Sequence, residues 1–214
     1  MNKTIRHPVF ARCYARVSQG MERQGIADRR RVLLGGLSGR VIEVGAGNGL
    51  NFGHYPPGVT EVVAVEPEPY LRQLAADAAR QAAVPIQVVD GTADQLPGSD
   101  GAFDAGVASL VLCSVADQAR ALAELRRVIR PGGELRFMEH ARADTSGLAR
   151  MQRLVDPVWP LVGGGCHASR DTLAAIHTAG FEVEQVERFR FPESRIPSPT
   201  APHILGIARR PGAG

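Results

Sequence analysis

The stretch VIEVGAGNGLNFGHYP, residues 41–56, joins a short apolar run to a loop with three closely spaced glycines. The glycines stand at alternate positions, Gly45, Gly47 and Gly49. Glycine directly after a strand permits a tight turn and lets a bound molecule approach backbone N–H groups. The stretch therefore predicts a buried strand that ends in a ligand-binding loop, and the neighbouring sequence must say which ligand.

Short, valine-rich apolar runs alternate with helical patterns on both sides of this loop. Strands buried on both faces have this composition, and we expect them at residues 40–44, 61–66, 85–90, 103–110 and 133–140. Helices are expected at 69–83 and at 117–129, the second with Asp117 as N-cap. Alternation of this kind indicates a parallel sheet with helices on both faces.

The C-terminal part predicts a different ending. A helix over 169–180, with Ser169 as N-cap, precedes two strands at 181–191 and 202–210. Two successive strands at the end favour a closing hairpin, so one of them runs antiparallel. The predicted fold is a doubly wound, Rossmann-like α/β sheet of seven mostly parallel strands with an antiparallel last strand.

The chain of 214 residues suits a single domain, 1–214. Two segments fall outside the alternation. Residues 1–36 are mostly helical by pattern and are expected to form an N-terminal cover. Residues 141–168, with a short helix at 148–155, are expected to form an insert over the carboxyl ends of the strands and thus over the active site.

Composition narrows the class of protein. Hydrophobic residues make up 44% of the chain and charged residues 22%, as in soluble globular domains. No apolar run reaches about 18 residues, and the start MNKTIRHPVF lacks a signal-peptide core, so we expect a cytoplasmic protein without a membrane anchor. The arginine clusters in 21–31 and 125–133 lack interleaved aromatic residues, so we interpret them as solvated helix faces and expect no nucleic-acid partner.

Cysteine usage also excludes some classes. Cys13, Cys113 and Cys166 are odd in number and far apart in sequence. This spacing argues against a disulfide framework and against a zinc site, so no metal is expected.

The glycine loop fits a dinucleotide site poorly. That fingerprint requires G-x-G-x-x-G, but position 50 is leucine. Glu43 would repel a pyrophosphate, whereas it suits a ligand with a cationic amino group. Glu66, 21 residues after Gly45 and at the end of the second strand, can accept both hydroxyls of a ribose.

The order of residues 43–49 resembles the first motif of class I S-adenosylmethionine-dependent methyltransferases. Three further segments resemble later motifs of that family: DGTADQLP, FDAGVASLVLCSV and LRRVIRPGGELRFMEH. The resemblance implies S-adenosylmethionine as cofactor, with the methionine part along the loop, the ribose on Glu66 and the adenine near Ala93. The implied cofactor residues are Glu43, Gly45, Ala46, Gly47, Gly49, Glu66, Pro67, Gly91, Thr92, Ala93 and Ser109.

The segments VLCSV, FMEH, DPVW and GCHASR extend the resemblance to the mammalian alkyl-thiol methyltransferases, over residues 10–209. It implies methyl transfer to the sulfur of a small thiol. The implied acceptor side comprises Cys113, His140, Trp159, Cys166, His167 and Arg170. Gly164 and His167 depart from that group, so a nitrogen, oxygen or carbon acceptor stays open, as does a module that binds the cofactor without turnover. The oligomeric state stays open too.

Methyl transfer needs mainly the positioning of two reactants, and a thiol needs only modest help to ionise. His140 is the first catalytic candidate and His167 the second, with His203 as a residue that could face the site from the last strand. We expect Glu139 to set the tautomer of His140, and Arg170 to fix the insert through Asp156. Cys113 and Cys166 are interpreted mainly as packing residues, because direct transfer needs no covalent intermediate.

Overall fold

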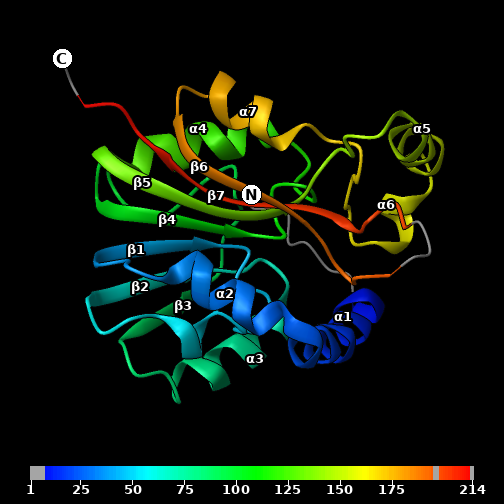
Figure 1. The fold of residues 1–214 in the computed structure, drawn as a ribbon. Helices are drawn as coiled ribbons and strands as arrows, with labels where there is room; N and C mark the ends of the chain where they lie inside the picture. The colour runs from blue at the N-terminus through cyan, green and yellow to red at the C-terminus, as the bar shows by residue number, and fades with distance from the viewer. Residues whose placement is uncertain (1–7, 195–197, 213–214) are drawn as a thin grey trace.

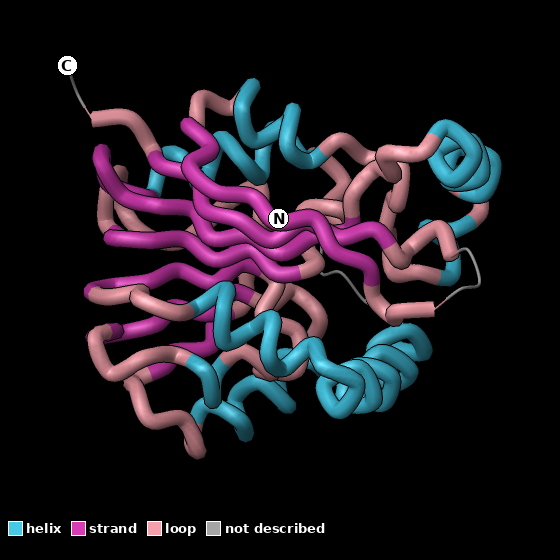
Figure 2. The backbone as a smooth tube through the Cα atoms, in the orientation of Figure 1, coloured by secondary structure: helices cyan, strands magenta, loops and turns pink. Residues whose placement is uncertain are grey.

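The computed structural model describes residues 8–194 and 198–212. Its centre is a seven-stranded sheet in the order β3-β2-β1-β4-β5-β7-β6, with helices on both faces (Figure 1, Figure 2). β7 runs antiparallel to both of its neighbours, β5 and β6, and the other strand pairs are parallel. The predicted antiparallel last strand is therefore confirmed. The strands are β1 (Gly39–Val44), β2 (Val59–Val65), β3 (Ile86–Val89), β4 (Phe103–Ser109), β5 (Ile129–His140), β6 (Glu182–Arg190) and β7 (Pro202–Arg209).

The helices divide into two layers and an end group. The bounds are α1 (Pro8–Met21), a π-helical segment η1 (Glu22–Ile26), α2 (Ala27–Leu34), a 3-10 turn η2 (Phe52–His54), α3 (Pro69–Ala79), α4 (Gln118–Val128), α5 (Ser146–Val155), α6 (Trp159–Val162) and α7 (Thr172–Thr178). Figure 1 shows α4 and α7 on one face of the sheet, α2 and α3 on the other, and α1, α5 and α6 together beyond one end of the strands.

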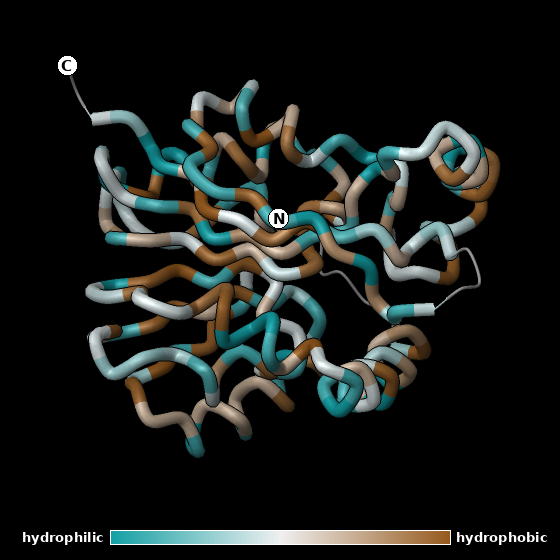
Figure 3. Tube along the Cα trace, viewed as in Figure 1, coloured by the Kyte–Doolittle hydropathy of each residue, from teal (hydrophilic) through white to brown (hydrophobic). Residues whose placement is uncertain are grey.

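Two hydrophobic cores hold these layers to the sheet. On one face, Leu122 and Leu125 of α4 and Ile176 of α7 are fully buried against the strands. On the other face, Leu34 of α2 and Ala75 of α3 are fully buried. Apolar residues concentrate along the central strands, as expected for strands covered on both sides (Figure 3). No helix in the described ranges is long and apolar enough to cross a membrane.

The helix starts follow capping chemistry. Asp117 caps α4 as predicted, because its carboxylate accepts the N–H of Arg120 at 2.9 Å. The predicted cap at Ser169 is wrong. Asp171 caps α7 instead, accepting the N–H of Ala174 at 3.1 Å, so the helix begins nearer its apolar residues.

The first helix lies over the edge that carries the glycine loop and over residues 141–168. A Cβ on Gly47 would lie 3.4 Å from the Tyr14 ring, and a Cβ on Gly164 would overlap the Phe10 ring. Phe10 and Tyr14 stack on each other with centroids 5.7 Å apart. α1 therefore touches both segments through one pair of aromatic rings.

Asp117→Ala removes the cap of α4 and should lower the free energy of unfolding by about 1 kcal/mol. Chemical denaturation measures the change. The control Asp94→Ala also removes an acidic side chain, but an exposed one in a loop, and should change stability by less than about 0.5 kcal/mol. Equal losses in both variants would contradict the assignment of the cap.

Candidate active site

The glycine loop adopts a backbone that only glycine accepts easily. Gly45, Gly47 and Gly49 have φ angles of 66°, 57° and 78°, in the left-handed region. A Cβ on Gly45 would lie 2.4 Å from Val111, and one on Gly49 would lie 2.9 Å from Phe52. The predicted turn after β1 is therefore present, and it packs directly on the turn after β4 that carries Val111.

Glu66 ties this loop to the end of β2. Its carboxylate accepts the N–H of Gly47 at 2.8 Å and the N–H of Glu68 at 2.9 Å. The residue is 5% exposed, and burial raises its pKa. Glu66 thus stands where the sequence places it, with lone pairs of both carboxylate oxygens still free to accept further donors.

The loop after β2 is fixed to the loop after β3. One guanidinium nitrogen of Arg72 donates to the carbonyl oxygens of Glu66 and Pro67 and to the carboxylate of Asp90, at 2.9, 3.0 and 3.0 Å. The candidate adenine segment 91–93 follows directly. Arg72 was not predicted as a site residue, and its role depends on a contact between two loops.

Glu43 lies beneath the loop, on β1. Its two carboxylate oxygens accept hydrogen bonds from Asn51 at 2.8 Å and from the Tyr55 hydroxyl at 2.7 Å. Burial raises its pKa from 4.5 to about 7. Both hydrogen bonds come from residues that follow the glycines, so Glu43 fixes the exit of the loop.

Arg30 of α2 is the charged partner of this region. It donates to Glu22 at 2.8 Å, to Asn51 at 2.8 Å and to Ser109 at 3.2 Å, and it is 5% exposed. The interpretation of its arginine cluster as a solvated face is wrong for this residue. The available signal was its spacing, because Arg30 shares a helical stripe with the apolar residues Ile26, Leu33 and Leu34.

A cluster of two cysteines and a histidine lies on the other side of the turn after β4. His140 ends β5, and its Nδ1 is 3.4 Å from Sγ of Cys113 and 3.3 Å from Sγ of Cys166. Cys113 is fully buried and Cys166 is 5% exposed. The Cys113 thiol and then His140 lower the pKa of Cys166, while its hydrogen bond to Cys166 and burial raise that of Cys113. The fold thus brings together three residues that lie far apart in the sequence.

Hydrogen bonds from both sides fix the turn that carries Cys113. The carboxylate of Glu139 accepts the N–H groups of Val111, Leu112 and Cys113 at 3.0, 2.9 and 3.1 Å. Its predicted role, to set the tautomer of His140, is therefore replaced by support of this backbone. Leu110, just before the turn, has φ 57°, a strained value for leucine.

Arg170 holds the same turn from the opposite side. Its guanidinium donates to the carbonyl oxygens of Leu112, Cys113 and Val115 at 3.0, 3.2 and 2.7 Å. The predicted contact with Asp156 is wrong, because that carboxylate binds Nδ1 of His167 at 3.0 Å. The backbone N–H of His167 donates to the carbonyl of Cys113 at 2.8 Å, so this residue contacts the turn through its main chain.

Trp159 lies beside Cys166. Its indole packs on Gly163, where a Cβ would come within 2.8 Å of Nε1. The indole N–H is buried without a close hydrogen-bond partner, and it contributes to the low pKa of Cys166. Trp159 therefore borders the cysteine–histidine cluster.

His203 continues the cluster across the sheet. It is paired with His140 on β5 and with Phe189 on β6, so the three rings share one face. Its ring centroid is 4.6 Å from that of His140 and 5.1 Å from that of Phe189. Burial lowers the pKa of His203 to about 3, so the ring is neutral near pH 7.

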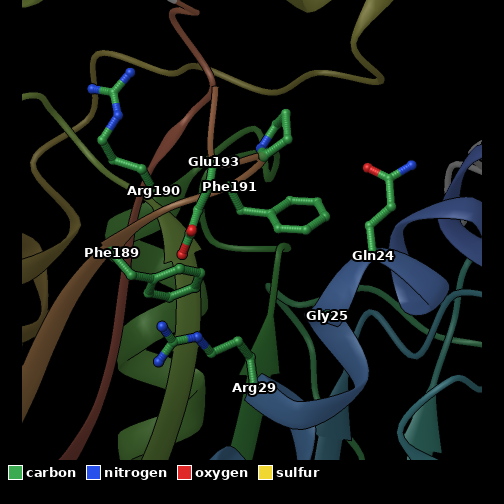
Figure 4. Close-up of a pocket in the computed structure, with 8 residues that line it drawn as sticks. Gln24, Gly25, Arg29, Phe189, Arg190, Phe191 and Glu193 are labelled. Carbon is green, nitrogen blue, oxygen red and sulfur yellow. The ribbon is translucent and has the colours of Figure 1, made fainter. Parts of the chain in front are cut away.

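A groove of about 390 Å³ lies at the outer end of this row of rings, between η1 and the end of β6. Figure 4 shows Arg29 beside Phe189 at one end and Gln24 opposite Phe191. The Arg29 guanidinium lies 4.3 Å from the Phe189 centroid. The groove therefore combines aromatic surface with charged groups of both signs, Arg29 and Glu193, two side chains away from His140.

Comparison with known proteins gives the family. Residues 42–137 match the model of the methyltransferase domain. The human Thiol S-methyltransferase TMT1B is 38% identical over 181 residues, which cover 82% of this chain and 73% of that protein. The human Thiol S-methyltransferase TMT1A is 36% identical over 179 residues, 81% of this chain and 72% of that protein.

Among solved structures, the fold is similar to that of geranyl diphosphate methyltransferase in complex with SAM. The TM-score is 0.67 at 15% identity, over 87% of this chain and 85% of the other. At this identity the likeness concerns the fold alone.

The raised pKa of Glu43 predicts a pH dependence of stability. A raised folded-state pKa contributes stability that is fully present below about pH 4.5 and is lost as the pH rises through 7. Between pH 5 and 8, wild type should therefore lose on the order of 3 kcal/mol relative to Glu43→Gln, which cannot ionise. Urea unfolding at both pH values measures the difference. The control Glu61→Gln, which alters a surface carboxylate paired with Arg40, should follow wild type. Parallel curves for wild type and Glu43→Gln would contradict the prediction.

Proposed function

The chain belongs to the family of methyltransferases that includes the thiol S-methyltransferases, and we propose that it transfers a methyl group from S-adenosylmethionine to the sulfur of a small thiol. The observation that carries the proposal is the contact between the two halves of the site. Val111 packs against Gly45 of the glycine loop, and Cys113, two residues later, contacts His140. The cofactor loop and the cysteine–histidine cluster are thus separated by a single turn.

The residues around the glycine loop fit S-adenosylmethionine chemically. This cofactor supplies an activated methyl group on a sulfonium and carries no phosphate, so a loop with two buried carboxylates suits it better than a nucleotide phosphate. Glu66 would accept the ribose hydroxyls with the lone pairs that Gly47 and Glu68 leave free. The glycine loop would line the methionine part, and residues 91–93 would meet the adenine.

The acceptor side is assigned to His140, Cys113, Cys166 and Trp159. A free alkyl thiol has a pKa near 8.5, so only a modest stabilisation of the thiolate is needed near neutral pH. An alcohol would require a much stronger base than any group in this cluster offers. The groove beside Phe189 would offer a larger acceptor an aromatic and charged surface next to the same row of rings.

Isotopically labelled S-adenosylmethionine, offered with an alkyl thiol and with the matching alcohol and amine, tests the proposal. We expect labelled thioether and at least 100-fold slower methylation of the other two acceptors. His140→Ala should lower kcat for the thiol by 10-fold or more, and the exposed control His177→Ala should leave it unchanged.

A labelled ether or methylamine without thioether would contradict the thiol acceptor. Cofactor binding without any labelled product would instead favour a binding module. In neither case would the family assignment change, because it rests on the comparisons.

A further inference from the structure

We propose that Cys113, His140 and Cys166 form a binding site for one zinc ion, with a fourth coordination position open to the acceptor sulfur. The binding of the metal stands on the geometry of these three side chains. Its catalytic use rests in addition on the proposed thiol methylation. The spacing of the cysteines in sequence had argued against zinc, and the fold removes that objection.

The three ligand atoms already lie about as far apart as the ligands of a single zinc ion. Nδ1 of His140 lies 3.4 and 3.3 Å from the two sulfur atoms, and all three atoms lie within 4.8 Å of each other. Zinc bound tetrahedrally at usual lengths, about 2.3 Å to sulfur and about 2.0 Å to nitrogen, separates such atoms by roughly 3.5 Å. Small side-chain adjustments would therefore suffice to close three bonds on one ion.

The backbone around the ligands is held in place by interactions that do not involve the metal. The N–H of Cys113 is bound by Glu139, and its carbonyl by the N–H of His167 and by Arg170. Cys166 follows two glycines in left-handed conformations and donates its N–H to the carbonyl of Gly163 at 3.1 Å. A set of ligands fixed in this way loses little freedom when a metal binds.

Charge balance also permits the ion. Two thiolates neutralise one divalent cation, as in structural and catalytic zinc sites with mixed cysteine and histidine ligands. Glu139 and Arg170, which carry opposite charges, bind opposite sides of the turn that carries Cys113 and offset each other. A zinc ion would thus leave this buried region without a net charge.

Three protein ligands leave a fourth tetrahedral position, the arrangement of catalytic zinc sites. An acceptor thiol that binds there would release its proton to solvent and stay as a zinc-bound thiolate. Its sulfur would then form a bond to the methyl carbon while the bond from that carbon to the sulfonium breaks. The products are a neutral thioether, which is a poor zinc ligand and leaves, and the demethylated cofactor.

Metal analysis of the full chain tests the site independently of activity. The protein is stripped with a chelator under reducing conditions, titrated with Zn²⁺ or Co²⁺ and freed of excess metal. We expect one metal per chain and, with Co²⁺, a near-ultraviolet band from thiolate-to-metal charge transfer. Cys166→Ser and His140→Ala should retain less than a tenth of an equivalent of zinc, whereas the control Cys13→Ser, which alters an exposed cysteine, should match wild type.

Several results would overturn the site. One is a wild-type chain that binds no metal in this titration, which needs no variant and so does not depend on how a variant folds. Others are equal zinc content in Cys166→Ser and wild type, and a disulfide between Cys113 and Cys166, seen as a loss of about 2 Da, in protein that takes up no metal after reduction.

Activity then separates the two proposals. Stripped enzyme should bind S-adenosylmethionine normally but methylate thiols at least 10-fold more slowly, with recovery on adding zinc. Full thiol methylation by metal-free enzyme would overturn the catalytic use of zinc. Zinc-loaded enzyme that methylates no thiol would overturn the proposed function while the metal stoichiometry still supports the site.

Discussion

The hydrogen bond from the Gly47 N–H to the Glu66 carboxylate fixes the geometry on which the rest of the site depends. It joins the turn after β1 to the end of β2, and the N–H groups of Gly45 and Ala46 reinforce the junction by donating to the carbonyl of Val65. The positive φ angles of the glycines make this approach sterically possible. Because Val111 rests on Gly45, the same junction also places the turn that carries Cys113. Cofactor side and acceptor side are thus two faces of one packed loop.

Buried charges concentrate around this edge of the sheet. Three buried carboxylates are each at most 5% exposed: those of Glu43, Glu66 and Glu139. Arg30 is 5% exposed and binds Asn51, which in turn binds Glu43. Burial of a charge costs free energy unless hydrogen bonds compensate, and each of these groups has two or more partners in the structure. Such polar groups add little to the free energy of folding, but they hold loop backbones in one arrangement. The buried polar groups therefore lie where two reactants must be positioned within a fraction of an ångström.

Local patterns in the sequence predicted what depends on neighbouring residues. The expected strand positions, the Asp117 cap and the place of Glu66 agree with the structure, since alternation, capping and motif spacing act within a few residues. The exception is β5, which begins at Ile129, four residues before the expected start. Contacts between distant segments were not predictable in this way. Arg30 looked like one of several surface arginines, Glu139 like a partner of the adjacent histidine, and the two cysteines like unrelated packing residues. The helical spacing of Arg30 indicated burial. Its partner Ser109 lies more than 20 positions away, however, as do the partners of Glu139 and Cys166, and a periodicity cannot reveal such contacts.

Calorimetric titration of S-adenosylmethionine into wild type, Glu66→Ala and Glu61→Ala tests most directly whether this junction holds the cofactor. Loss of hydrogen bonds to a charged acceptor should cost roughly 1.5–3 kcal/mol, which raises the Kd of Glu66→Ala by about 10- to 150-fold. Glu61 lies on the same strand but is paired with Arg40 at the surface, so its replacement should leave the Kd unchanged. A Kd for Glu66→Ala equal to that of wild type would contradict the placement of the cofactor at the end of β2.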